Sequence, residues 1–161
     1  MAGVQPTGLV IEGKTCLYKR KHNTGKGDQW DKPLPAKEWS HPAWREDIME
    51  TTDLITYPTE NFTDGSKFGD KVGAGVAIYM DKRLVRQYKY RLQNHCSNNQ
   101  AEQIAILKSL EQLPSIADQT NRIVAIYTDS KVTLASLKNN TIHSFLIEEI
   151  RIKVRNLTKQ N

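Results

Sequence analysis

Three acidic residues occupy positions from which they could share one chemical task. Asp64 follows a short strand-like run, Asp129 follows a second, and Glu102 lies in the first turn of an expected helix between them. Because open α/β sheets place their sites at the carboxyl ends of strands, we expect Asp64 and Asp129 side by side, with Glu102 leaning over them. Three like charges this close are unfavourable without cations, so the group predicts a divalent-metal site.

The donor atoms of this predicted site are all carboxylate oxygens, which favours Mg²⁺ or Mn²⁺ over Zn²⁺. Two such ions roughly 4 Å apart could activate water on one side of a phosphodiester and stabilise the leaving oxygen on the other. Each residue alone also has a purely structural interpretation. Asp64-Gly65 is a common turn, Asp129 could only cap a helix, and Glu102 could only favour the helix dipole. Their joint placement favours the metal site.

An antiparallel meander is expected to position Asp64. Strand-like alternation covers 60–63, 72–79 and 84–91, with turns at 67–70 and Asp81-Lys82. Ser97-Asn98-Asn99 then offers capping side chains to a helix whose apolar residues recur every three to four positions up to Pro114. This amphipathic helix would carry Glu102.

A buried strand, parallel to the first strand, is expected to position Asp129. The run Ile123–Tyr127 is apolar, short and rich in β-branched residues, as in a strand buried on both faces and parallel to the first strand. Asp129-Ser130 can cap a helix that ends near Leu137, and a last helix carries an apolar stripe over 143–157. The predicted class is therefore α/β: a mixed sheet, with three antiparallel strands and a parallel fourth, covered by helices.

Composition limits the remaining choices. The chain has 161 residues and a net charge of +5, and the excess of positive charge falls on residues 57–161, as nucleic-acid binding would need and as a solvated face also explains. Residues 1–56 hold all three tryptophans and show no sustained helical or strand periodicity of apolar residues. This predicts a linker or extension before a domain at 57–161. Two isolated cysteines and no leader-like or membrane-spanning run predict an intracellular protein, cytoplasmic or nuclear rather than secreted.

Four motifs in order resemble the ribonuclease H family, more narrowly the ribonuclease H domain of insect-type non-LTR retrotransposon polyproteins. The resemblance covers about 57–158 and is carried by Phe62-Thr63-Asp64-Gly65-Ser66, Gly73-Ala74-Gly75-Val76-Ala77, Asn98-Asn99-Gln100-Ala101-Glu102 and Ile126-Tyr127-Thr128-Asp129-Ser130. It implies hydrolysis of the RNA strand of an RNA/DNA hybrid, with an upstream reverse transcriptase as partner.

The resemblance also assigns roles to individual residues. Asp64 would bridge two metal ions, Glu102 would bind one of them near the ribose 2′-OH, and Asp129 would bind the other. Asn98 and Asn99 match residues that contact the hybrid in its minor groove, where the 2′-OH distinguishes RNA from DNA. Gly65, Ser66 and Ser130 match small residues near the nucleic-acid backbone.

One departure from the family weakens the expected activity. The family continues with a fifth strand and a last helix that carry a fourth metal-binding Asp, and this sequence has no counterpart after Glu149. We therefore expect a C-terminally truncated domain with weak or no activity by itself. The missing strand would leave the run Ile123–Tyr127 at an open sheet edge, which predicts self-association through that edge.

Two other functions remain as hypotheses. The first is a non-catalytic nucleic-acid-binding or spacer module of a degenerate retroelement copy. The second is a transposase or integrase of related fold, but in those the Glu follows both Asp residues. Here Glu102 lies between Asp64 and Asp129, which favours ribonuclease H.

Overall fold

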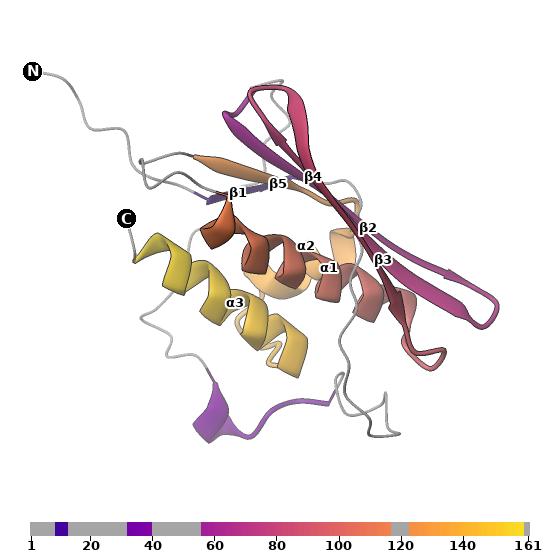
Figure 1. Ribbon diagram of the computed structural model, residues 1–161. Coiled ribbons are helices and arrows are strands. Elements are labelled where there is room, and N and C mark those ends of the chain that lie inside the picture. The colour runs from indigo at the N-terminus through magenta and orange to yellow at the C-terminus, as the bar shows by residue number, and fades with distance from the viewer. Residues whose placement is uncertain (1–8, 13–31, 40–55, 117–122, 160–161) are drawn as a thin grey trace, which may run out of the picture.

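The computed structural model describes residues 9–12, 32–39, 56–116 and 123–159. In these ranges Figure 1 shows one mixed sheet with helices packed on it. The strands are β1 (Leu9–Glu12), β2 (Thr59–Phe68), β3 (Lys71–Met80), β4 (Arg83–Leu92) and β5 (Val124–Tyr127). The helices are α1 (Asn98–Gln112), α2 (Lys131–Lys138) and α3 (Phe145–Thr158), with short 3-10 turns η2 (Ala36–Glu38) and η3 (Leu113–Ser115).

The order of strands across the sheet is β1-β5-β2-β3-β4. Strands β2, β3 and β4 form the antiparallel meander, and β5 pairs with β2 in parallel. The predicted α/β class and its mixed sheet are therefore confirmed. None of the helices in the described ranges is long and apolar enough to cross a membrane.

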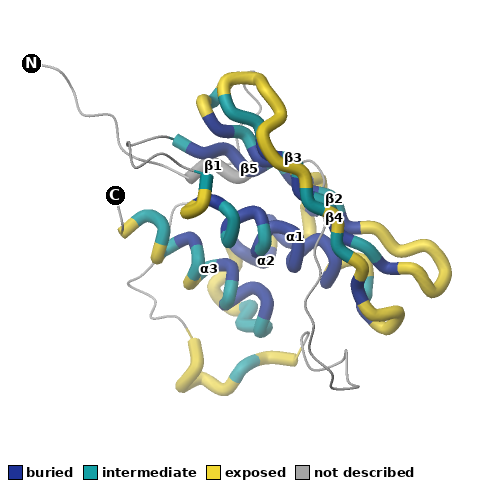
Figure 2. Tube along the Cα trace, in the orientation of Figure 1, coloured by how far each residue is buried: buried dark blue, intermediate teal, exposed yellow. Residues whose placement is uncertain are grey.

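The hydrophobic core lies between the sheet and the helices. Alternate residues of β3 point into it, namely Val72, Ala74, Val76 and Ile78, while Gly73, Gly75 and Ala77 face the other side. Helix α1 packs on β2 and β3 and is covered by α3 in turn, so most of its residues are buried. Figure 2 shows this contrast between buried α1 and largely exposed β4.

Helix α1 starts where the capping residues predicted it. The Ser97 hydroxyl accepts a hydrogen bond from the Gln100 backbone N–H, and the Gln100 side chain accepts one from the Ser97 backbone N–H. This reciprocal capping box satisfies two backbone donors that have no partner within the helix. The start of α1 is thereby fixed, and with it the height of Glu102 above the sheet.

Strand β2 is longer than predicted. The sequence suggested a strand that ends before Asp64, but β2 continues to Phe68, and the turn falls at Gly69-Asp70. Asp64 pairs with Gly75 and Gly65 with Ala74, so the long ladder with β3 keeps both in the strand. Asp64-Gly65 is therefore not a turn, and only Gly69, at φ 56°, adopts the left-handed turn conformation here.

The expected open edge of the sheet is also not observed. Residues Leu9–Glu12 form β1 and pair in parallel with β5, Leu9 opposite Val124 and Glu12 opposite Tyr127. The sequence indicated no strand in this region, because a four-residue run is too short to show a period. Since β1 supplies backbone partners along β5, the reason for expecting self-association through that edge is removed.

A second segment before residue 57 also contacts the domain. The Leu34 backbone N–H donates to the His143 carbonyl oxygen, and Pro33 bridges to Ser144. The Trp39 ring stacks on the His143 ring, with centroids 3.9 Å apart. Among the three tryptophans whose role the sequence left open, Trp39 thus packs on the α2–α3 connection, while Trp30 and Trp44 lie outside the described residues.

Candidate metal and nucleic-acid site

Asp64 and Asp129 are brought together by the parallel pairing of β2 with β5. Phe62 pairs with Tyr127 in this ladder, and each Asp follows its paired residue by two positions. Two positions along β2 preserve the face, so Asp64 leaves the sheet on the side of Phe62, opposite the helices, while Asp129 lies two residues beyond the end of β5. The Thr63 hydroxyl donates to the Tyr127 carbonyl oxygen at 2.7 Å, which ties the two strands together beside Asp64.

Glu102 approaches the two Asp residues from α1 because Gly65 lets the helix come close. A Cβ atom at Gly65 would lie 2.7 Å from the carbonyl carbon of Ala101 and 2.9 Å from Cα of Glu102. Only glycine therefore fits beneath this part of α1. Glu102 is the fifth residue of the helix and lies in its second turn, not in the first turn as predicted.

The three carboxylates interact electrostatically. Burial, the charge of Asp129 and, to a smaller extent, the charge of Asp64 together raise the pKa of Glu102 to about 7, although a hydrogen bond from the Gly65 backbone N–H lowers it. Burial and then the charge of Asp129 also raise the pKa of Asp64. A carboxyl group that is half protonated near pH 7 beside two others is a site that a cation would stabilise.

The residues suit a hard divalent cation in chemistry and in part in geometry. Oε2 of Glu102 is buried and has no hydrogen-bond partner in the described part of the chain, which leaves a free oxygen ligand. The donor set consists of oxygens only, as Mg²⁺ prefers. Within the described residues, however, no three His, Cys, Asp or Glu side chains are gathered closely enough to form a finished metal centre. The charges of Asp129 and Asp64 affect the pKa of Glu102, but the three side chains do not lie close enough together to share a metal ion.

The predicted nucleic-acid residues fall into an exposed group and a buried one, and the buried one includes Gly65, which lies against α1. Asn98 and Asn99 are the first residues of α1 and are exposed beside the site, and Ser66 is exposed on β2. Ser130 is buried and caps α2, because its Oγ accepts a hydrogen bond from the Thr133 backbone N–H and lies 2.7 Å from the Thr133 Oγ1. The first group has free surface for a ligand, whereas Ser130 positions Asp129.

Lys67 is a positioning residue that the sequence did not reveal. Its Nζ donates to the carbonyl oxygens of Asn94 and Cys96, at 3.1 and 2.9 Å. These bonds hold the β4–α1 connection against β2, immediately before Asn98 and Asn99. A lysine near a turn normally indicates only solvent exposure, so no sequence pattern would have identified this role.

Together these features define an α/β domain with a carboxylate site where a parallel strand pair ends beside a helix. The family model described as RNase H matches residues 58–160. The chain belongs to the RNase H family, and the match covers the meander, α1, β5, α2 and α3. Comparison with curated proteins gives no match, and neither does comparison with solved structures.

Proposed function

We propose that this chain is a ribonuclease H-type endonuclease domain that hydrolyses the RNA strand of RNA/DNA hybrids. The observation that carries the proposal is the electrostatic coupling of Asp64, Glu102 and Asp129, contributed by β2, α1 and the end of β5. Membership of the RNase H family supports the reaction class. The three carboxylates are proposed to hold Mg²⁺ or Mn²⁺, two ions in the complete site.

The residues of the chain have separable roles in this proposal. Divalent cations bound there would supply an activated water and neutralise charge at the cleaved phosphodiester. Asp64 offers oxygen ligands from β2 and Asp129 from the end of β5, and Glu102 adds the buried Oε2 from α1. Exposed Asn98 and Asn99 can donate hydrogen bonds to the minor groove of the hybrid, where the 2′-OH distinguishes the RNA strand.

We expect weak cleavage by this chain, because the carboxylates of the described residues are not gathered closely enough to form a finished metal centre. The four matched motifs also support a retroelement replication protein as the context, with a reverse transcriptase as partner. They likewise support an intracellular location, where such an element would copy itself.

The test is cleavage of a labelled RNA/DNA hybrid with Mg²⁺ and with Mn²⁺, compared for the wild type, Asp64→Asn and Asp129→Asn. We expect slow cleavage by the wild type and none by either variant, with hybrid binding retained in all three. Cleavage that persists in both variants would contradict the assigned site. Binding without any cleavage by the wild type would instead support the non-catalytic binding module.

A further inference from the structure

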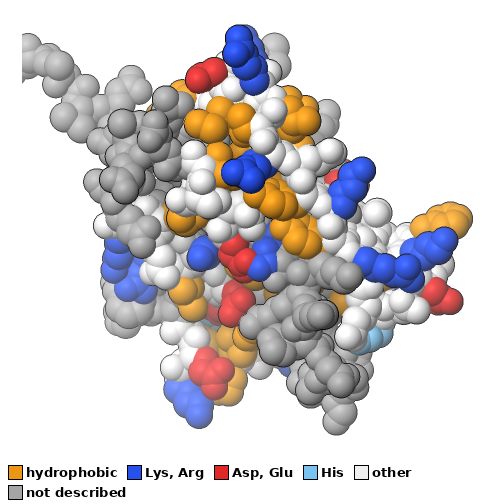
Figure 3. Space-filling model, viewed as in Figure 1, with side chains coloured by type: hydrophobic (Ala, Val, Ile, Leu, Met, Phe, Trp, Pro, Cys, Tyr) orange, Lys and Arg blue, Asp and Glu red, His pale blue; other side chains and the backbone are white. Residues whose placement is uncertain are grey.

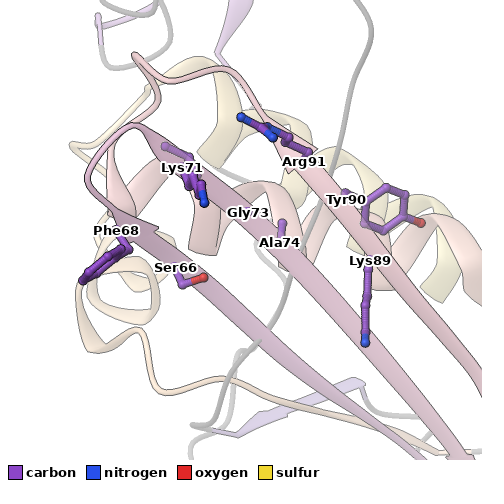
Figure 4. A pocket seen from close by; sticks show the side chains of 9 residues that line it. Ser66, Phe68, Lys71, Gly73, Ala74, Lys89, Tyr90 and Arg91 are labelled. Atoms are coloured by element: carbon purple, nitrogen blue, oxygen red, sulfur yellow. The ribbon is translucent and has the colours of Figure 1, made fainter.

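A shallow groove crosses the open face of the sheet next to the carboxylates. It has a volume of about 540 Å³ and is lined from strands β2, β3 and β4. Figure 4 shows Ser66, Lys71, Lys89 and Arg91 arranged around the backbone of Gly73, with Phe68 at one end. No helix of the described residues covers this face, as Figure 1 shows.

The shape of the groove follows from the register of the strands. Ser66 pairs with Gly73, which pairs with Arg91, so a residue without a side chain lies between two that have one. The next row repeats this arrangement with Asp64, Gly75 and Lys89. Small residues along β3 therefore form a floor of backbone, and longer side chains on β2 and β4 form the walls.

The cations of the groove have no charge partner among the residues that the structure describes. Lys71, Lys89 and Arg91 are exposed, and none has a hydrogen bond or ion pair with another part of the described chain. Figure 3 shows Lys and Arg side chains gathered toward the β2–β3 turn, at this end of the sheet. Three exposed cations on one face repel one another, so an anionic ligand would be favoured there.

The register of the strands links the groove to the candidate metal site through Lys89, which lines the groove. Lys89 and Asp64 belong to one row, separated only by Gly75, so they stand about 10 Å apart across two strand spacings. Lys89 and Arg91 are two positions apart on one face of β4, about 7 Å along the strand. A chain of phosphates could contact both cations and continue directly to the carboxylates.

We propose that this groove binds the sugar–phosphate backbone of a nucleic-acid strand and guides it to the Asp64–Glu102–Asp129 site. Lys89 and Arg91 neutralise phosphates, Lys71 adds charge at the β2–β3 end, and the Gly73 backbone allows the strand to lie close. Recognition is of the backbone alone, because the floor offers no side chains that could read bases. Phe68, 86% exposed, provides a ring on which a base could stack at the end of the groove. The inference rests on the proposed function for the choice of an RNA/DNA hybrid as ligand.

The experiment measures binding of a fluorescent RNA/DNA hybrid by anisotropy in EDTA, over a range of KCl concentrations. The variant K89Q/R91Q removes two cations from the groove. The control R83Q/R86Q removes two exposed cations from the same strand, outside the groove, and changes the net charge equally. We expect K89Q/R91Q to weaken binding about tenfold near 0.1 M salt and to lower the slope of log K against log salt by roughly 2. The control should change both much less.

A third variant distinguishes weaker binding caused by lost charge from weaker binding caused by a damaged fold. K89R/R91K keeps both charges and should bind like the wild type, and thermal unfolding of all variants should show an intact fold. Equal weakening by K89Q/R91Q and R83Q/R86Q would overturn the inference, because it would show an effect of net charge only.

The two proposals can fail separately. Cleavage by a wild type whose binding does not respond to K89Q/R91Q would keep the endonuclease and reject the groove. Groove-dependent binding of duplex DNA and hybrid alike, without cleavage, would keep the groove and reject the endonuclease. A wild type that binds no nucleic acid would reject both.

Discussion

Among the residues of the candidate site, Glu102 has the charged form that folding disfavours most. The residue is 6% exposed and is affected by the charges of Asp129 and Asp64, so its charged form is disfavoured. The pKa is raised from 4.5 to about 7. The stabilising contribution of the retained proton is therefore fully present below about pH 4.5 and is lost as the pH rises through 7.

Replacement of Glu102 by Gln tests this sign directly. Without metal, Glu102→Gln should stabilise the domain at pH 8 by on the order of 2 kcal/mol and have little effect near pH 4.5. Urea unfolding in EDTA at the two pH values measures the difference. Asp70→Asn, on the exposed β2–β3 turn, is the control and should not reproduce the effect. Equal effects of Glu102→Gln at both pH values would refute the raised pKa.

Replacement of Gly65 should affect both the stability of the domain and cleavage. Gly65→Ala would place a methyl group against the α1 backbone and should lower the free energy of unfolding by about 1–3 kcal/mol. It should also abolish hybrid cleavage, because α1 and Glu102 move away from Asp64. Gly69→Ala has open space but a left-handed φ of 56°, so it should cost about 1 kcal/mol and leave cleavage unchanged. Similar losses of cleavage in both variants would contradict this account.

The residues of the site show what the sequence can predict at this scale. The types and order of Asp64, Glu102 and Asp129 suffice to propose a metal site, and their role as ligands stays a prediction. The roles of Gly65 and Lys67 were not, because each depends on a distance between two elements that are far apart in sequence. The row that joins Lys89 to Asp64 depends on register in the same way.

At the scale of elements, the α2–α3 connection is held by one buried network. Arg151 of α3 donates to the Ser136, Leu137 and Asn139 carbonyl oxygens and so caps the end of α2. Its guanidinium also binds Glu148, which is 1% exposed and is contacted by His143. The Trp39 ring packs on the same histidine, so the segment 32–39 shares this anchor.

Loss of Arg151 should therefore destabilise the domain strongly. Arg151→Met removes the cap of α2 and takes the guanidinium away from the buried Glu148 carboxylate, which predicts a loss of about 3 kcal/mol in chemical unfolding. Asn156→Ala, at an exposed position of the same helix, should change stability by less than about 0.5 kcal/mol. A double variant that also carries Glu148→Leu should recover part of the loss. Failure of this recovery would show that the carbonyl cap, rather than the buried charge, dominates.

The elements themselves were predicted better than their ends. Strand alternation located β3 and β4, and apolar spacing with the capping residues located α1. The end of β2 was wrong because Asp64 and Gly65 have turn chemistry, and their pairing with β3 overrides that local preference. Local sequence describes an isolated segment, whereas the ladder supplies several backbone hydrogen bonds at once.

At the scale of the whole molecule, β1 adds residues Leu9–Glu12 to the sheet as an edge strand beside β5. Val10→Pro combined with Ile11→Pro removes the backbone donors of two adjacent β1 residues, so at least one bond to β5 should be lost. Amide hydrogen exchange should then accelerate in Val124–Tyr127 and remain unchanged in β3. Unchanged exchange in β5 would mean that β1 does not protect this edge. The pairing was not predictable, because nothing in four residues identifies a partner more than a hundred positions away.

The same pairing has a consequence for the time course of folding. The meander of β2, β3 and β4 closes through short turns, whereas β1 and β5 meet only after a very long loop has been closed, at a larger cost in entropy. β1 should therefore join the sheet after the rate-limiting step. Destabilising changes in β1 would then accelerate unfolding and leave the refolding rate nearly unchanged. The most distant contact in the chain would govern how long the native state lasts rather than how quickly it is reached.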